Sequence, residues 1–418
     1  MDALERLRAL TPRSRFCEDV GHVVCVMASS RGGSSVSMEM FRHSRSLLHF
    51  RGEVNPFLAM AGLVYPDSGT GSDALNAVHA TEEVREIVGG AMGREAGQPA
   101  PWPDDEPGRA ALAQDVLWRL TAQWPEVALS PESVTEAVDH ALTRVSAGQR
   151  AAPHEIEAFQ LSLCRSLRGI NPWFYDVDPS AIQSALPDIS APIGAPSARI
   201  VEEPPFVLHQ AWRRASPDQV ASLPLMMKTP SNAYRMDFLR ALFPNARVQV
   251  LHLTRNPAAA INGLVDGWRF RGFHAHRLGS PHDIQGAPER DWWKYDLPPG
   301  WEAWTNRSLV EVAGFQWRSA HTHILKTRGE DALQVRFEDL TGAARMKTFE
   351  AIFAWMGADL DAPMRDVITA GLPPVMATER PRQRRWFARA DLLEPVLADP
   401  DIQRTAEALG YTDRADWV

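Results

Sequence analysis

The sequence predicts an α/β fold with a mainly parallel central sheet flanked by helices on both faces. Two observations support this class: short apolar runs that are too brief for helices, and helical periodicity that begins soon after them. Strands buried on both faces of a parallel sheet form near-continuous apolar runs, and their alternation with helices is typical of βαβ units. We expect the whole chain, residues 1–418, to form a single domain built on this sheet.

The first strand and helix lie near the N-terminus. The run "HVVCVMA", residues 22–28, predicts a strand, and "SSRGG" predicts a turn after it. Apolar residues then recur at three- and four-residue spacings, which predicts a helix over about residues 34–47. The following run, "LLHF", predicts a second strand that closes at Gly52 and Glu53.

A second series of strands and helices begins near residue 223. The strands predicted in this series are residues 223–228, 247–254 and 332–337. After the middle strand, Asn256 has the chemistry of a helix N-cap and Pro257 stands in its favoured first-turn position. Another helix is expected around Arg345–Met356.

Two segments do not follow this pattern. Residues 66–195 are helical and irregular, with a proline-rich loop expected at 97–108, so we expect a helical insertion or subdomain rather than part of the sheet. Residues 266–307 hold five tryptophans among prolines, glycines and histidines, with no clean period. A long aromatic loop of this kind predicts a lid or a binding surface.

Composition narrows the possible partners and compartment. The formal net charge of −8 argues against a nucleic-acid partner bound through a broad basic face. The apolar run at 23–28 is too short for a signal peptide or a membrane span, so no membrane partner is expected. The cysteines Cys17, Cys25 and Cys164 lack the spacing of a zinc site or a disulfide framework, so a cytoplasmic location is expected. The oligomeric state is left open.

The turn at residues 29–35, "SSRGGSS", has the chemistry of an anion site. A turn from a parallel strand into a helix presents unpaired N–H groups and the positive end of the helix dipole. Glycines let the backbone approach a ligand closely, serines add hydroxyl donors, and Arg31 supplies a planar charged fork. The turn lacks the lysine that follows the last glycine of nucleoside-triphosphate P-loops.

The order strand, [ST]-R-x-G-[ST]-[ST], helix resembles the 5'-phosphosulfate loop of sulfotransferases that use 3'-phosphoadenosine 5'-phosphosulfate (PAPS). The resemblance implies a P-loop-like sulfotransferase fold, PAPS as cosubstrate and no metal. It also implies that Arg31 and the backbone of Gly32, Gly33, Ser34 and Ser35 bind the phosphosulfate.

A second motif resembles the element of this family that binds the 3'-phosphate, R-[DN]-P at the end of a strand. "LTRNPAAAING" supplies Arg255, Asn256 and Pro257, but the eighth residue after the arginine is Gly263 where the family usually has serine. The resemblance implies that Arg255 binds the 3'-phosphate. Asn262 or the backbone of Gly263 would then replace the serine hydroxyl.

Three further segments resemble the same family. Lys228 in "KTPSN" matches a lysine that lies near the transferred group, and "VRFEDL" matches a strand end that we take as structural. Near the C-terminus, "RPRQRRWFARADLL" resembles a basic stretch that closes over the nucleotide. Its candidates are Arg384, Arg385 and Trp386, and a solvated basic segment remains the alternative.

The acceptor hydroxyl needs a base, and Glu53 is the first candidate. Some members of the family use a glutamate in a "GE" segment after the phosphosulfate helix, which Gly52 and Glu53 match. A partly desolvated carboxylate beside bound anions would have a raised pKa, although Glu53 could instead simply pair with Arg51 or a nearby cation. The histidine alternatives are His43 and His49, followed by the weaker His252, His274 and His276.

These resemblances imply an enzyme that moves a sulfuryl group from PAPS to a hydroxyl by in-line displacement. The acceptor would be a small molecule or a peptide, and the tryptophans of residues 266–307 favour an aromatic or extended apolar one. Two other functions stay open: a catalytically silent nucleotide-binding scaffold, which the glycine at 263 supports, and a P-loop kinase, which the missing lysine opposes.

Overall fold

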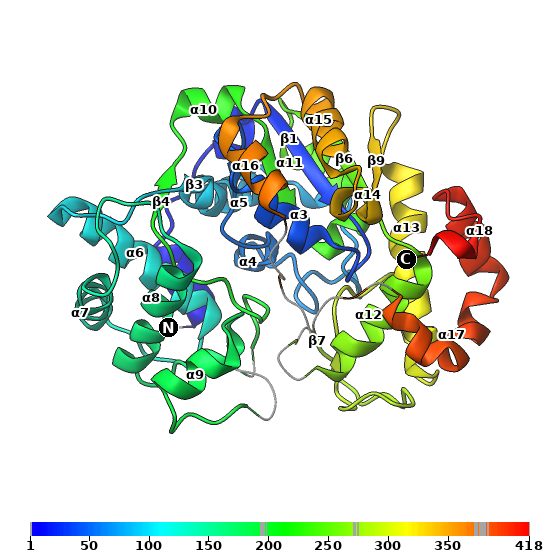
Figure 1. The fold of residues 1–418 in the computed structure, drawn as a ribbon. Helices are drawn as coiled ribbons and strands as arrows, with labels where there is room; N and C mark the ends of the chain where they lie inside the picture. Colours follow the sequence, from blue (N-terminus) through cyan, green and yellow to red (C-terminus); the bar gives the residue numbers. More distant parts are fainter. Residues whose placement is uncertain are drawn as a thin grey trace.

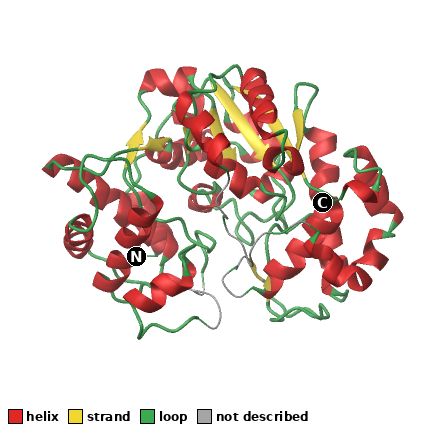
Figure 2. Ribbon diagram, viewed as in Figure 1, coloured by secondary structure: helices red, strands yellow, loops and turns green. Residues whose placement is uncertain are grey.

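The computed structural model describes residues 2–192, 197, 199–270, 273, 276–371, 375, 382 and 384–417. Helices lie on both sides of a central sheet, and two mainly helical lobes extend from the opposite ends of the sheet (Figures 1 and 2). The N-terminus lies in the lobe that holds residues 106–185, and the C-terminus lies in the other lobe (Figure 1).

Seven strands form the central sheet in the order β4-β3-β2-β5-β1-β6-β9. Their bounds are β1 His22–Met27, β2 Leu48–His49, β3 Gly97–Pro99, β4 Trp212–Arg214, β5 Leu225–Lys228, β6 Arg247–Thr254 and β9 Leu333–Arg336. From β2 to β9 all neighbours are parallel, whereas β3 and β4 pair antiparallel at one edge. Val26 of β1 lies opposite Lys228 of β5 and Leu251 of β6, so the loops after these strands emerge together.

The predicted α/β class is confirmed, because β1 is covered on both faces. Val23, Cys25 and Met27 pack into one apolar core, whereas Val24 and Val26 pack into a second. A strand buried in this way has no polar face, which explains the unbroken apolar run in the sequence.

Helices cover the sheet and complete the C-terminal lobe. Outside residues 66–195 they are α1 Ala3–Ala9, α2 Phe16–Asp19, α3 Ser34–Phe41, α4 Asn55–Met60, α10 Pro217–Ser222, α11 Met236–Leu242, α12 Pro257–Arg269, α13 Leu309–Thr327, α14 Phe337–Thr341, α15 Arg345–Met356, α16 Ala362–Ala370, α17 Ala390–Leu397 and α18 Pro400–Ala408. The predicted cap is confirmed, since Asn256 Oδ1 accepts from Ala259 N at 2.8 Å. Of the helices in the described residues, none has an apolar stretch sufficient to cross a bilayer.

The helix predicted over about residues 34–47 corresponds to α3. It is shorter than the periodicity predicts and ends at Phe41. Downstream serines bond to a neighbouring segment instead: Ser44 Oγ donates to Asp361 at 3.2 Å, and Ser46 Oγ donates to the Asp359 carbonyl at 2.6 Å. Hydroxyl bonds of this kind compete with helix continuation, and apolar spacing does not reveal them.

Residues 66–195 are mainly helical, as predicted, but they also contribute to the sheet. The helices are α5 Glu82–Glu95, α6 Glu106–Gln123, α7 Pro131–Leu142, α8 Pro153–Ser166 and α9 Pro179–Ala185. Part of the expected proline-rich loop is β3, in which Gly97 pairs with His49 and Arg214. The expectation that this segment lies wholly outside the sheet was therefore wrong. A strand of three residues is too short to show alternation in the sequence.

The tryptophan-rich segment packs against the second lobe. It contains the two-stranded ribbon of β7, His276–Arg277, and β8, Trp292–Trp293, followed by the 3-10 turn Trp301–Trp304. Trp268, Trp293 and Trp301 are buried in an apolar core with α12 and α13. Most of its aromatic surface is thus used for packing.

Candidate functional site

A cavity of about 1070 Å³ opens where β1, β5 and β6 end. Its walls come from the loop at residues 30–35, the turn at 51–56, the end of β5 and the start of α12. Residues within 153–176 and 202–210 supply a further wall, and Arg382 and residues 384–386 contribute from the C-terminal part of the chain. The cavity is lined by Arg31, Gly33, Ser34, Ser35, Glu53, Lys228, Arg255, Asn262, Gly263, Arg384, Arg385 and Trp386 of the residues proposed from the sequence. Gly32 does not line it, and a Cβ on Gly32 would lie 2.8 Å from the Ser29 carbonyl oxygen.

Backbone geometry explains the composition of the 30–35 loop. Arg31 and Gly33 have left-handed φ angles of 62° and 97°. A Cβ on Gly33 would lie 2.1 Å from the ring of Phe337, so only glycine fits there. Gly33 is also the N-cap of α3 and has no side chain to bond the first turn, so the N–H groups of that turn are available to an anion.

Arg31 and Arg255, which are expected at opposite ends of the nucleotide, are linked by a hydrogen bond to the backbone of this loop. Arg255 Nη1 donates to the Arg31 carbonyl at 3.2 Å, and both side chains line the cavity. The Arg31 guanidinium lies 5.2 Å from the centre of the Phe273 ring, and that of Arg255 lies 5.0 Å from Phe337. Burial lowers the pKa of Arg255, which indicates a cation held in a partly dehydrated place.

The unusual glycine at 263 is explained by the position of Arg31. A Cβ on Gly263 would lie 3.3 Å from Arg31 Cβ, so the arginine side chain passes directly over this residue. Asn262, the proposed substitute for serine, accepts from Arg389 at 3.1 Å. It is therefore linked to the C-terminal segment as well as to the cavity.

Two arginines of the C-terminal basic segment are tied to α12, whereas Arg384 is exposed. Arg385 and Arg389 both form ion pairs with Asp266. Trp386 is buried in the core of the second lobe and also lines the cavity. Through Asp266 and Asn262, α12 thus contacts Arg385 and Arg389 on either side of Trp386.

Lys228 and Glu53 lie together beside the loop. Lys228 Nζ forms an ion pair with the Glu53 carboxylate and a hydrogen bond of 3.1 Å with Ser35 Oγ. The ion-pair alternative for Glu53 is thus realised, with Lys228 as the nearby cation. The pair sets a carboxylate and an ammonium group beside the anion-binding turn.

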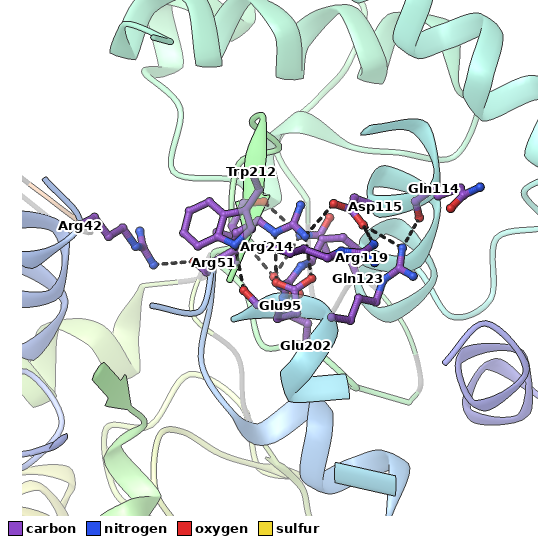
Figure 3. A network of polar contacts seen from close by, with 12 residues as sticks. Arg42, Arg51, Glu95, Gln114, Asp115, Arg119, Gln123, Glu202, Trp212 and Arg214 are labelled. Carbon is purple, nitrogen blue, oxygen red and sulfur yellow. Dashed lines mark hydrogen bonds and ion pairs between the residues drawn. The ribbon is translucent and has the colours of Figure 1, made fainter. Parts of the chain in front are cut away.

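A buried network of ion pairs is centred on Arg51 and Arg119, and Arg51 precedes Glu53 by two residues (Figure 3). Arg51 pairs with Glu95 and Asp115 at 3.1 Å each, and Arg119 pairs with Glu95 and, at 2.8 Å, with Glu202. The network thereby joins the end of β2 to α5, α6 and the segment around residue 202.

Gly52 connects this network to the site. A Cβ on Gly52 would lie 2.8 Å from Val207 Cγ2 and 3.2 Å from Arg119 Nη1. The turn that carries Glu53 is therefore packed directly on the network and on residues 202–207. Glycine is required here for close approach.

Two carboxylates in the cavity wall were missed by the sequence analysis. Burial raises the pKa of Glu203 to about 7 and that of Asp296 to about 6. Asp296 accepts hydrogen bonds of 2.7 Å from Ser30 Oγ and from the Tyr234 hydroxyl. Neither acid belongs to a recognisable motif, and the only signal near Glu203 is its place in the run "EEPP".

The histidine alternatives lie elsewhere. No histidine of the described residues lines the cavity, and His274 falls outside those residues. Burial lowers the pKa of His49 to about 3, and His252 lies in β6 bonded to His321 at 3.0 Å. His276 lies 3.6 Å from Asp73, which with a neighbouring glutamate raises its pKa against the effect of burial.

The tryptophans of residues 266–307 are also absent from the described walls of the cavity. That segment contributes Phe273, Lys294, Tyr295 and Asp296 instead. The tryptophans therefore give no reason to favour an aromatic acceptor.

Comparison with models of protein families identifies one family. A model described as "Sulfotransferase family" matches residues 107–362, more than half of the chain, a range that includes Lys228 and Arg255 but not Arg31. A search of curated proteins found no match.

Solved structures with similar folds were also found. A sulfotransferase domain from the curacin biosynthetic pathway has 11% identity and a TM-score of 0.40, covering 94% of this chain and 98% of that one. The sulfotransferase domain of the Synechococcus olefin synthase has 15% identity and a TM-score of 0.35, with 94% and 95% covered. A Mycobacterium avium sulfotransferase has 14% identity and a TM-score of 0.33, with 91% and 76% covered.

Proposed function

Because this chain belongs to the sulfotransferase family, we propose that it transfers a sulfuryl group from PAPS to a hydroxyl of a small molecule or a peptide. The observation that supports PAPS as donor is the shared position of Arg31 and Arg255. Both line one cavity, and Arg255 Nη1 lies 3.2 Å from the Arg31 carbonyl. A nucleotide with phosphates on both its 3' and 5' sides needs a cation at each, and these two arginines supply them.

In this proposal the loop at residues 30–35 binds the 5'-phosphosulfate through backbone N–H groups and Arg31. Arg255, Asn262 and Gly263 lie at the 3'-phosphate. Arg385 and Trp386 cover the nucleotide.

Sulfuryl transfer, like phosphoryl transfer, requires in-line geometry and neutralisation of the charge that develops on the bridging oxygen. Lys228 and Arg31 are the cations proposed for that oxygen. A carboxylate in the cavity wall takes the acceptor proton, and the candidate from the sequence, Glu53, is paired with Lys228. The loss of one preorganised donor would slow the reaction roughly a hundredfold, about 3 kcal/mol in the barrier.

The acceptor would enter between this centre and residues 153–210, which we propose as a subdomain that forms the acceptor wall. Cys17, Cys25 and Cys164 are buried free thiols, which supports a cytoplasmic location.

The test compares adenosine 3',5'-bisphosphate (PAP) with ADP by thermal unfolding. PAP at a hundredfold excess over its dissociation constant should stabilise the protein by about 2.7 kcal/mol, and ADP should stabilise it less because it lacks the 3'-phosphate. Arg255→Ala should remove the difference between the nucleotides, whereas Arg31→Ala should weaken both. Arg168→Ala, at an exposed arginine away from the cavity, is the control. Equal effects of PAP and ADP on the unaltered protein would contradict the 3'-phosphate site.

Two results would indicate a different function. Stabilisation by ATP with magnesium but not by PAP would indicate a kinase. PAP binding without sulfated product from a panel of phenols and alcohols would indicate a silent scaffold.

A further inference from the structure

Two carboxylates, on different segments, lie near one another in the cavity wall. Glu53 follows β2, and Glu203 belongs to the segment that leads toward β4. The Glu53 carboxylate forms an ion pair with Lys228, whereas no ion pair of Glu203 occurs within the described part of the chain. Glu203 instead accepts one hydrogen bond, from the side-chain amide of Asn55 at 3.2 Å.

Hydrogen bonds and ion pairs hold two residues beside Glu203: Asn55, which donates to it, and Glu202, which precedes it in the chain. Asn55 Oδ1 accepts from Arg235 Nη1 at 2.7 Å, and Arg235 pairs at 3.3 Å with Asp73. On the other side, Glu202 accepts from Arg119 at 2.8 Å and from Gln123 at 3.0 Å. The Glu203 side chain is thus fixed in the wall without a cation bound to it.

The surroundings of Glu203 raise the basicity of its carboxylate. Burial is the main cause that raises the pKa of Glu203 to about 7, and the negative charges of Glu53 and Asp73 add to it. His276 and the amide of Asn55 act in the opposite direction without cancelling these effects. A base is most effective at neutral pH when its pKa lies near 7.

We propose that Glu203 is the catalytic base for the acceptor hydroxyl, and that Glu53 positions Lys228. This rests on the proposed function. As the acceptor oxygen bonds to sulfur, the bond from sulfur to the bridging oxygen breaks, and its electron pair leaves with PAP. The acceptor proton passes to the Glu203 carboxylate and then to water. Lys228, held by Glu53 and Ser35, stabilises the charge on the departing phosphate.

Turnover of PAPS with phenol and with the more acidic 4-nitrophenol tests this assignment. Glu203→Gln should lower kcat with phenol about a hundredfold or more, because general base catalysis contributes that much. The loss of kcat should be smaller with 4-nitrophenol, because this more acidic phenol releases its proton more readily. The rise of kcat near pH 7 should disappear in the variant. The KM for PAPS should stay unchanged. A purely structural role would lower both rates alike.

Glu136→Gln is the control. Glu136 is exposed on α7 and does not line the cavity. This variant should keep kcat within about twofold of the unaltered protein. The proposal is overturned if Glu203→Gln keeps the kcat and pH profile of the unaltered protein while Glu53→Gln loses turnover.

If neither phenol is turned over, the pH dependence of Tm tests the assignment of Glu203 instead. A carboxyl group with a raised pKa keeps its proton longer in the folded than in the unfolded state. Glu203 should therefore destabilise the protein increasingly as pH rises from about 4.5 to about 7, and the effect should stay constant above that. The Tm of Glu203→Gln should exceed that of the unaltered protein at pH 8 but approach it at pH 5. A constant Tm difference across this range would overturn the proposal. Failure of the proposed function would appear separately, as an absence of PAP binding.

Discussion

Removing the charge of Glu95 tests whether the buried network centred on Arg51 and Arg119 supports the site (Figure 3). Glu95 is fully buried and is the carboxylate shared by Arg51 and Arg119. Substitution by glutamine keeps the size of the side chain but leaves those two cations with one negative partner fewer. The change is therefore electrostatic and creates no cavity.

The pKa of Glu95 gives the magnitude. Burial opposes ionisation, but the ion pairs with Arg119 and Arg51 outweigh it and lower the pKa from 4.5 to about 2. At ~1.36 kcal/mol per pH unit, this difference corresponds to about 3 kcal/mol of stability at pH 7. The value agrees with the roughly 3–5 kcal/mol that breaking a buried ion pair costs.

Unfolding by urea at several pH values is the assay. Glu95→Gln should lose about 3 kcal/mol at pH 7. Because the folded pKa is depressed, the stabilisation by Glu95 is fully present above about pH 4.5 and is lost as pH falls toward about 2, so the two proteins should converge in acid. Glu86→Gln, which breaks an exposed ion pair of 3.3 Å with Arg13, should change stability by less than about 1 kcal/mol. A loss for Glu95→Gln no larger than that of this control, or one independent of pH, would refute the reasoning.

Two glycine substitutions follow from the same packing arguments. Gly33→Ala should lower the free energy of unfolding by left-handed strain of ~1–2 kcal/mol and by a clash with Phe337 of ~1–3 kcal/mol. Gly62 also has a left-handed φ, of 72°, but a Cβ there would have no neighbour within 4 Å. Gly62→Ala should therefore add the strain alone. Equal losses of unfolding free energy in the two variants would show that the contact with Phe337 is unimportant. Gly52→Ala should push the turn that carries Glu53 away from Val207. This shift should lower kcat at least about tenfold and leave the affinity for PAP unchanged. A kcat near that of the unaltered protein would contradict the proposed role of this packing.

The sheet and the anion-binding loop could be predicted because their signals are local. β6 occupies Arg247–Thr254 and α15 occupies Arg345–Met356, as expected, since each is a continuous run with a clear period and a defined end. The loop around Arg31 is also encoded locally, through glycine where only glycine fits. Parallel pairing then brings the ends of β1, β5 and β6 together, which placed Arg31, Lys228 and Arg255 in one cavity.

The rest of the site depends on contacts that no local pattern contains. Glu203 becomes notable only because the fold buries it near Glu53 and Asp73, which lie far away in the sequence. The buried network is likewise assembled only when α5 and the segment around residue 202 pack near β2. This packing brings together Arg51, Glu95 and Glu202. A glutamate outside any motif is usually a solvated side chain, so the sequence offered no reason to choose Glu203 over Glu202.

Gly263 shows how a departure from a family pattern can be misread from the sequence alone. At the level of the motif, glycine in place of serine removes a hydroxyl and suggests a weakened 3'-phosphate site. In the structure the Arg31 side chain lies over Gly263, 3.3 Å from where a Cβ would stand, while Arg255 holds the backbone of the same arginine. The space of the missing side chain is thus used to position a permanent cation between the two proposed phosphate sites. A guanidinium bonds phosphate oxygens more strongly than a neutral hydroxyl does, so the substitution is compatible with retained PAP binding.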